Sequence, residues 1–224
     1  LAVPMTTTDG VVGVIALRNG PDDAPYRTQD RDLLVFVADQ LAAAIGRKQL
    51  HAQLRFMALH DELTRLPNRR LFHDRLDTAL AHARRQQERL ALLFLDLNRF
   101  KQVNDSFGHA CGDRLLQEVA RRVSACLRNS DTLARLGGDE FVVLLEDIVL
   151  AADAGLVLDK IHQALAAPVD LGDGHRLQIS VSVGVAHYPE HGGNREELIA
   201  HADQAMYAAK AVAALAGSGA HQPA

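Results

Sequence analysis

The sequence predicts an α+β fold in which helices lie on one face of a mainly antiparallel sheet. The first observation is the order of segments from residue 90 onward, where strand-like and helix-like patterns follow one another as β-α-β-β-α-β. The second is the run at residues 90–97, whose nearly continuous apolar character is typical of a strand buried inside a sheet. The chain has 224 residues, 48% of them hydrophobic, which is enough for one complete domain and part of another.

The N-terminal segment is predicted to form a strand at residues 11–17, a loop at 19–25 and then a helix. Thr28 can cap this helix, and apolar side chains follow at helical spacing: Leu34, Val37, Leu41, Ala44 and Ile45. We expect the helix to continue to Met57, which gives roughly 30 residues and a length of ~45 Å. Its apolar stripe favours a parallel two-chain coiled coil. The heptad is imperfect at residues 46–48, so packing against its own domain is the alternative.

The elements after this helix are punctuated by capping and turn residues. Pro67 ends a helix and Asn68 can cap the next one, and Asp61 and Thr64 are interpreted as part of the same capped turn. Further helices are expected at residues 71–89, 113–128, 151–167 and 195–215. Strict alternation at residues 179–185 predicts a last strand with one buried face.

Composition and charge exclude several classes of protein. The net charge of −4 argues against a general nucleic-acid surface. No apolar run approaches the ~18 residues that span a bilayer, and no charged segment precedes an apolar core as in a signal peptide. Cys111 and Cys126 lack the spacing of metal or disulfide pairs, so a reduced, cytosolic setting is the simpler interpretation.

Two glycines and two acids form the most informative stretch of the chain. Residues 135–145 read Arg-Leu-Gly-Gly-Asp-Glu-Phe-Val-Val-Leu-Leu, which predicts a β-hairpin with Asp139 and Glu140 at its tip. Adjacent carboxylates on a turn repel one another unless a cation lies between them, so the pair indicates a Mg²⁺ site. Gly137 and Gly138 would let a bulky anion or base approach the backbone closely. A plain hairpin without a ligand is the alternative.

A second stretch upstream gives this hairpin its context. Residues 92–113 read Leu-Leu-Phe-Leu-Asp-Leu-Asn-Arg-Phe-Lys-Gln-Val-Asn-Asp-Ser-Phe-Gly-His-Ala-Cys-Gly-Asp. Together the two stretches closely resemble the GGDEF family of diguanylate cyclases, which join two GTP molecules into cyclic di-GMP. The resemblance runs from about His60 to Lys210 and implies a ferredoxin-like, nucleotidyl cyclase palm.

The N-terminal strand and helix resemble the end of a GAF sensor domain. This gives three predicted parts: residues 1–46 as the C-terminal fragment of a GAF-like domain, 47–59 as a helical linker, and 60–224 as the GGDEF domain. A strand and helix without sensor ancestry is the alternative.

Asp96 ends a buried apolar strand, where an unpaired carboxylate is costly, so it either caps the next turn or holds a cation. The resemblance implies that Mg²⁺, or Mn²⁺ in its place, is bound by Asp96, the Leu97 carbonyl and Asp139. Glu140 is the second acid of the motif. It is expected either to bind a second metal or to help deprotonate the attacking 3′-hydroxyl, and the sequence leaves both open.

Asn104 and Asp113 are the candidate readers of guanine. A carboxylate can accept hydrogen bonds from the guanine N1–H and N2–H₂ groups, which adenine lacks. Helix capping is the alternative, especially for Asp113 at the start of an expected helix.

The phosphates of the substrate are expected to lie near a short helical turn. The backbone amides of Arg99, Phe100 and Lys101 could bind them, and Lys210 matches the phosphate-binding lysine of the family. Ala214 stands where the family usually has an arginine, and the loss of one charge-assisted contact would cost ~1.5–3 kcal/mol of GTP binding.

Arg128 and Asp131 lie three residues apart, and five residues separate Asp131 from Gly137. The resemblance implies that this is the family's inhibitory product site. Such a pair is otherwise a surface ion pair that contributes little. Lys160 is a candidate supporting charge.

The resemblance implies a magnesium-dependent diguanylate cyclase that is inhibited by its product and needs a homodimer, because each chain offers one guanine site. A weak or inactive domain that acts as a receptor for cyclic di-GMP or GTP is the alternative, and a palm that makes other cyclic nucleotides is a third. Fold alone does not separate these functions.

Overall fold

The computed structural model describes residues 1–224 except 9, 19, 21–23, 171–175 and 219–224. The chain divides into two compact units, Leu1–Ala58 and Leu59–Ala224, and each is described by itself.

The first unit is a β-hairpin packed on a long helix. Strands β1 (Ala2–Thr7) and β2 (Gly10–Ala16) pair antiparallel, and α1 (Thr28–Leu59) runs for 32 residues. The sequence predicted the second strand and the length of the helix but missed β1, which contains a proline. The buried face of the helix also differs from the expected one: Leu34, Ala38 and Ala42 are buried, whereas Val37 and Leu41 are 39% and 46% exposed.

The second unit is built on a four-stranded sheet with the order β4-β5-β3-β8. Its strands are β3 (Arg89–Leu97), β4 (Thr132–Gly137), β5 (Glu140–Ile148) and β8 (Val181–Tyr188), and every neighbouring pair is antiparallel. Residues 90–97 of β3 are all buried, as the apolar run predicted. The α+β palm predicted from the segment order is confirmed.

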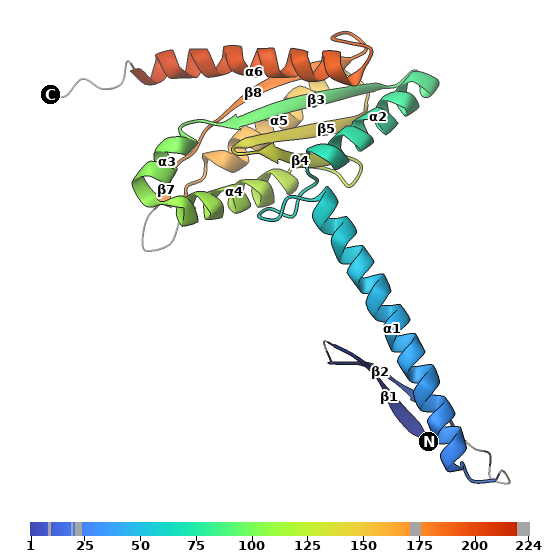
Figure 1. Cartoon of the computed structure of the whole chain (residues 1–224). Coiled ribbons are helices and arrows are strands. Elements are labelled where there is room, and N and C mark those ends of the chain that lie inside the picture. The colour runs from blue at the N-terminus through green and yellow to red at the C-terminus, as the bar shows by residue number, and fades with distance from the viewer. Residues whose placement is uncertain (9, 19, 21–23, 171–175, 219–224) are drawn as a thin grey trace. The chain divides into compact units, whose positions relative to one another are not determined.

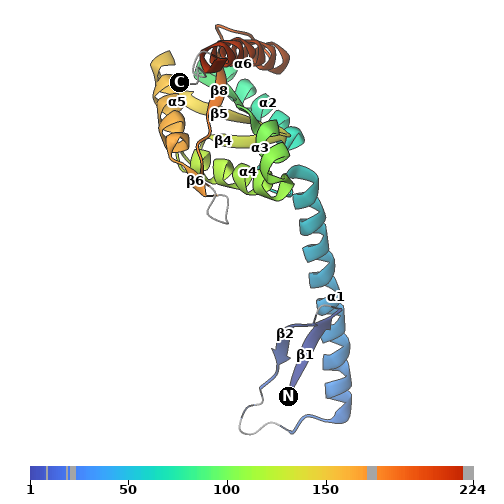
Figure 2. The ribbon, with the colours of Figure 1, turned by 90° about the vertical axis from the view of Figure 1, so that its left-hand side faces the viewer.

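Helices cover both faces of this sheet, which corrects the prediction of helices on one face (Figures 1 and 2). They are α2 (Arg69–Gln86), α3 (Phe100–Phe107), α4 (His109–Ser124), α5 (Ala151–Ala166) and α6 (Arg195–Ser218), with a small pair of strands, β6 (Val169–Asp170) and β7 (Arg176–Leu177). Leu93 and Leu95 of β3 face a core with α4 and α5. Leu92 and Phe94, on the other face, pack with α2 and α6. The apolar side chains of β3 therefore pack alternately into two cores, one on each face of the sheet.

The last strand, β8, is also covered on both faces, and this corrects the prediction of one buried face. Ser182, Gly184 and Ala186 are buried, while Val183 and Val185 are half-buried against the opposite core. The cause lies in Gly184, where an added Cβ would come 2.0 Å from the Ala202 carbonyl oxygen of α6. The backbone of α6 thus lies directly on β8, because no side chain separates them.

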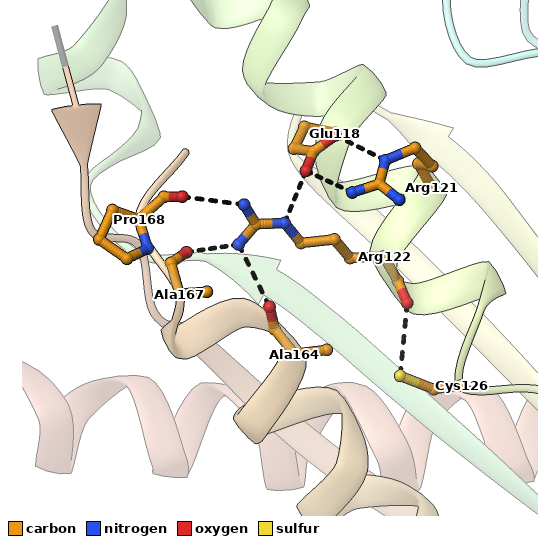
Figure 3. Close-up of polar contacts among 7 residues, drawn as sticks. All are labelled: Glu118, Arg121, Arg122, Cys126, Ala164, Ala167 and Pro168. Carbon is orange, nitrogen blue, oxygen red and sulfur yellow. Dashed lines mark hydrogen bonds and ion pairs between the residues drawn. The ribbon is translucent and has the colours of Figure 1, made fainter. Parts of the chain in front are cut away.

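An arginine joins α4 to the end of α5 (Figure 3). The guanidinium of Arg122 donates to the backbone carbonyls of Ala164 (3.2 Å), Ala167 and Pro168 (2.9 Å), and it also binds Glu118 at 2.7 Å. The last carbonyls of a helix lack partners within the helix, so a cation there satisfies them. Glu118 binds Arg121 as well, and these contacts lower the pKa of its carboxyl group to about 2.

Gly184→Ala is expected to destabilise the second unit. The new Cβ would meet backbone atoms of α6 at 2.0 and 2.2 Å, so the helix must move, at a cost of about 1–3 kcal/mol or more in the free energy of unfolding. Urea denaturation measures the change. Gly155→Ala is the matched control, since its Cβ meets nothing within 4 Å inside α5, and it should be neutral or stabilising by about 0.5–1 kcal/mol. Equal stability of the two variants would contradict the close approach of α6.

The ionised carboxylate of Glu118 should stabilise the protein at neutral pH and lose this effect in acid. A carboxyl group whose pKa falls on folding, here from 4.5 to about 2, stabilises the fold above pH 4.5 and loses this contribution as the pH falls towards 2. Glu118→Gln should therefore lower the free energy of unfolding by about 1 kcal/mol at pH 7, a value reduced by solvent screening. The difference from the wild type should shrink in urea titrations below pH 4.5, and a constant difference would exclude the ionised Glu118 as its source.

Candidate active site

Asp96 lies buried near the end of the central strand. It is 7% exposed, and in the sheet register it lies opposite Glu140 of β5 and Ser182 of β8. Side chains alternate along a strand, so Asp96 shares the face of Phe94, which α2 and α6 cover. The next residue, Leu97, ends β3 and is buried on the other face.

A lysine of α6 balances the charge of Asp96. The Nζ atom of Lys210 lies 2.7 Å from Asp96 Oδ1, and the lysine side chain remains partly exposed. The sequence predicted either a capped turn or a bound cation for Asp96 and a phosphate contact for Lys210, but it did not predict that the two side chains bind each other.

The hairpin tip places two further carboxylates near Asp96. Gly138 and Asp139 form the turn, while Glu140 begins β5, so Glu140 lies just beyond the predicted tip. Gly137 and Gly138 have φ angles of 145° and 54°, which side chains rarely adopt. Burial raises the pKa of Asp139, and the charge of Asp96 raises it further, against the opposing charges of Lys210 and Arg135. The charges of Asp96 and Asp139 therefore interact across the site.

Glu140 faces the α2 and α6 side of the sheet. Its Oε2 atom lies 3.7 Å from Arg69 Nη2 of α2, and the two residues line a pocket of about 450 Å³ together with Phe94 and Asp203. Burial raises the pKa of Glu140; Arg69 lowers it, and the charges of Asp139, Asp203 and Asp96 raise it again. This excess of negative charge suits a cation or a proton donor at this end of β5.

The carboxylates suit a hard divalent cation only with help from other ligands. Within the described residues, no three His, Cys, Asp or Glu side chains are placed to hold a metal ion together. Asp96, the carbonyl of Leu97 and Asp139 would supply oxygen ligands, which Mg²⁺ prefers, and Mg²⁺ usually takes its remaining ligands from water and substrate phosphates.

The chain after β3 turns at once into α3. Arg99 precedes this helix with a φ angle of 62°, and Phe100 and Lys101 form its first turn, where backbone N–H groups have no helical acceptor. A pocket of about 610 Å³ lies beside this turn and is lined by Asn98, Arg99 and Lys210 among others. Positive charge and a helix N-terminus meet there, which suits an anionic group.

The two candidate guanine readers lie where α3 meets α4. Asn104 is on α3, and its Oδ1 atom would be 2.0 Å from a Cβ added to Gly112, so its amide lies against the first turn of α4. Asp113 follows Gly112 and is exposed. Because α4 begins at His109 with Gly108 as its N-cap, Asp113 lies one turn inside the helix. The capping alternative for Asp113 is therefore wrong.

The candidate inhibitory residues form a turn after α4. The Arg128 backbone N–H donates to Asp131 Oδ2 at 2.8 Å, and both residues line a small pocket of about 40 Å³. Lys160 does not line this pocket; its carbonyl oxygen lies 3.6 Å from the Sγ of Cys126. The side chain of Ala214 lies outside the described part of the chain.

One polar contact of the hairpin was missed by the sequence analysis. The Arg135 guanidinium binds the carboxylate of Asp61 and the carbonyl of Gly138, next to Asp139. Asp61 was interpreted only as part of a capped turn. It does accept from the Thr64 N–H and hydroxyl groups, at 2.8 and 2.6 Å. Residues 61 and 135 are 74 apart in the chain, and no local pattern predicts that they meet.

Asp139→Asn should stabilise the protein in EDTA, where no divalent cation is bound. A carboxyl group whose pKa rises on folding destabilises the fold when ionised, and this cost is absent below its ordinary value of 3.8. The amide should therefore raise the free energy of unfolding at pH 7 by about 0.5–1 kcal/mol, with no gain below pH 3.8. Urea denaturation at both pH values measures this. Asp159→Asn, at an exposed position of α5, should change neither value, and a destabilised Asp139→Asn would contradict the interaction with Asp96.

Comparison with known proteins identifies the family. Residues 58–214 match the family "Diguanylate cyclase, GGDEF domain", and residues 1–45 match the GAF domain. The chain is 48% identical over 160 residues to the diguanylate cyclase TpbB of Pseudomonas aeruginosa, a match that covers 71% of this chain and 37% of TpbB. The chain therefore spans little more than a third of that relative. None of the helices in the described part of the chain has the length and hydropathy to cross a bilayer.

Solved structures agree with this assignment. The GGDEF domain of TpbB superposes with a TM-score of 0.67 at 48% identity, covering 68% of this chain and 88% of that domain. The coiled coil and GGDEF domain of DgcB from Caulobacter crescentus, solved in complex with c-di-GMP, gives a TM-score of 0.72 at 29% identity and covers 80% and 95% of the two chains. The chain accordingly belongs to the GGDEF family of diguanylate cyclase domains.

Proposed function

We propose that this protein is a diguanylate cyclase, which condenses two GTP molecules into cyclic di-GMP and releases two pyrophosphates. The observation that carries the proposal is the buried Asp96, which lies opposite Glu140, interacts with the charge of Asp139 and binds Lys210. In each half of the reaction, a 3′-hydroxyl oxygen bonds to the α-phosphorus of the other nucleotide. The bond from that phosphorus to the leaving pyrophosphate breaks, and the hydroxyl proton passes to a base or water.

The acids would hold the triphosphate through a bound metal ion, and the lysine would contact it directly. Bound Mg²⁺ would neutralise phosphate charge and polarise the α-phosphate, with Asp96, the Leu97 carbonyl and Asp139 as its ligands from the protein. Once a bound metal ion neutralises the charge of Asp96, Lys210 would move from Asp96 towards the phosphates. Glu140, with its raised pKa, is the candidate to accept the proton of the 3′-hydroxyl or to bind a second ion.

Guanine would be read at the junction of α3 and α4. Asn104 and Asp113 come from different helices and lie on either side of Gly112, so together they can contact one edge of a planar base. Asp113 is exposed and has no capping role, which leaves its carboxylate available to the N1–H and N2–H₂ groups of guanine.

Two chains are needed because each has one such site. Exposed apolar side chains along α1 are a candidate surface for pairing, and they include Leu33, Phe36, Leu41, Leu50, Leu54 and Met57. The coiled coil that precedes the GGDEF domain in the DgcB structure supports this arrangement. Product inhibition at Arg128 and Asp131 is part of the proposal, and the bound product would remain largely outside the pocket, whose volume is only about 40 Å³.

A receptor function is the second candidate, and Ala214 is the observation that favours it. Without the arginine usual at this position, the triphosphate loses one charge-assisted contact. A domain with weak GTP binding could still bind cyclic di-GMP at Arg128 and signal without turnover.

Incubation with Mg²⁺ and GTP tests the proposal, with chromatographic identification of the product. We expect cyclic di-GMP from GTP, none from ATP, and at least a ~100-fold lower rate for Asp139→Asn because a ligand of the reacting centre is lost. Undiminished turnover by that variant would remove the metal assignment.

Arg128→Ala is the matched control, because it leaves the proposed catalytic residues intact. It should keep the initial rate and require a higher concentration of added cyclic di-GMP for inhibition. If the wild type binds cyclic di-GMP without making it, the receptor function replaces the cyclase.

A further inference from the structure

Asn98 follows directly after the central strand β3 and binds two serines where β8 begins. Its side-chain Nδ2 donates to Ser180 Oγ at 3.0 Å, and its Oδ1 accepts from Ser182 Oγ at 2.8 Å. Its backbone N–H also donates to the Ser180 carbonyl at 2.9 Å. The side-chain amide uses both its donor and its acceptor, so Asn98 is held to residues 180–182 by three hydrogen bonds.

These hydrogen bonds act at the point where the chain turns from β3 into α3. The ladder of β3 with β8 ends at Leu97, and Arg99 follows with a φ angle of 62°, which residues other than glycine rarely adopt. Helix α3 then begins without a hydrogen bond from a side-chain cap. Asn98 therefore carries the contact with β8 one residue beyond the ladder and holds the turn whose free amides begin α3.

Ser182 connects the same contacts to the candidate metal ligand. It is 3% exposed and lies opposite Asp96 in the register of β8 with β3. A buried hydroxyl group without a partner is unfavourable, and Asn98 supplies the partner. The turn and Asp96 are therefore both fixed relative to one residue of β8.

The amide of Asn98 makes these contacts without a charge. Asn98 and Ser180 line the pocket of about 610 Å³ beside the turn, and the charged residues among its described lining are Arg99 and Lys210, both positive. A carboxylate at this position could accept from both serine hydroxyl groups, since a hydroxyl can rotate to donate, so it could keep the geometry. It would, however, place a negative charge beside an anion bound in the pocket.

We propose that Asn98 is a positioning residue for the triphosphate. It fixes the turn at residues 98–101 to β8 through Ser180 and Ser182, and its neutral side chain leaves the positive charge of the pocket undiminished. The inference rests on the proposed function and deepens it, because it assigns both the position of the phosphate-binding amides and the affinity of the pocket for polyphosphate to one side chain. The amides of the turn would contact the phosphates, and Asn98 acts through them.

Two substitutions separate the geometry from the charge. The probe is the α,β-methylene analogue of GTP, which cannot release pyrophosphate, and calorimetry in Mg²⁺ measures its Kd. Asn98→Asp should raise the Kd about tenfold relative to the wild type in about 0.1 M salt, and only about twofold in about 1 M salt, where charges are screened within ~3 Å. Asn98→Leu has a similar size but loses the side-chain hydrogen bonds, so its loss of affinity, also about tenfold, should not depend on salt.

Asn194→Asp is the matched control for charge. Asn194 Oδ1 accepts from the Glu197 N–H at 2.9 Å at the start of α6, and aspartate can make the same cap while adding the same charge to the protein. This variant should bind the analogue as the wild type does. In steady-state kinetics, Asn98→Asp should raise KM for GTP about tenfold and change kcat less than about threefold. Wild-type affinity in Asn98→Asp, or equal weakening in Asn194→Asp, would overturn the role of the neutral side chain.

Amide hydrogen exchange without nucleotide tests the positioning role and does not need activity. The amides of Asn98, Gln102 and Val103 donate to backbone carbonyls, and their exchange should rise about tenfold in Asn98→Leu but stay near the wild-type rate in Asn98→Asp and Asn194→Asp. Unchanged exchange in Asn98→Leu would overturn the positioning role, and so would an equal rise throughout β5, which would indicate global destabilisation.

The same measurements distinguish a failure of this inference from a failure of the cyclase function. If the wild type binds the analogue but makes no cyclic di-GMP, the cyclase function fails, and affinity and exchange still decide the role of Asn98. A wild type that does not bind the analogue would overturn the role of Asn98 towards phosphate.

Discussion

The candidate site of the second unit is built around one charge pair, the buried Asp96 with the partly exposed Lys210. A carboxylate that is 7% exposed inside a sheet is unfavourable unless a cation lies against it, and the lysine ammonium lies 2.7 Å away. The pair joins the central strand to the last helix, across the face that α6 covers. The same carboxylate is the proposed metal ligand, so the atom that helps hold α6 on the sheet is also the one that the chemistry needs. In the proposed mechanism, binding of a divalent cation at Asp96 would therefore be coupled to release of the lysine.

The close packing of α6 on β8 helps to bring this pair together. Gly184 has no side chain to hold the helix away, and Ala202 and Met206 of α6 lie over it. From there the helix runs on to Lys210, one turn beyond Met206, above the end of β3. On the opposite side of β3, its register with β5 brings the hairpin tip to the end of β3 that carries Asp96. A packing feature on one strand and a strand register on another thus determine where the charged groups meet.

Local patterns in the sequence predicted the parts of the site, but not how they join. The apolar run of β3, the glycine turn and the cap at Asn68 were predicted because each is recorded in a few neighbouring residues. The buried faces of β8 and α1 were predicted wrongly, since burial there depends on what packs against them. Alternating Val and Ser suggested one covered face, whereas Gly184 allows α6 to cover the other.

The sequence did not predict the side-chain pairs between distant segments, because these too depend on how the chain packs. Lys210 and Asp96 are 114 residues apart, and Arg135 and Asp61 are 74 apart. Each of these residues was visible in the sequence as a charged group near a motif. Only the three-dimensional fold shows that the charges neutralise one another in pairs.

The helix α4 joins the two proposed nucleotide sites of this domain, the guanine site at Asp113 and the inhibitory site at Arg128. It has 16 residues, Asp113 lies near its start, and Arg128 follows four residues after its end. Arg122, in the last turn of α4, binds backbone carbonyls at the end of α5 and so holds this end of the helix in place. One inserted residue would turn one end against the other by about 100° and shift it by about 1.5 Å. Homologous domains should therefore vary freely in the exposed side chains of this helix while keeping its residue count constant.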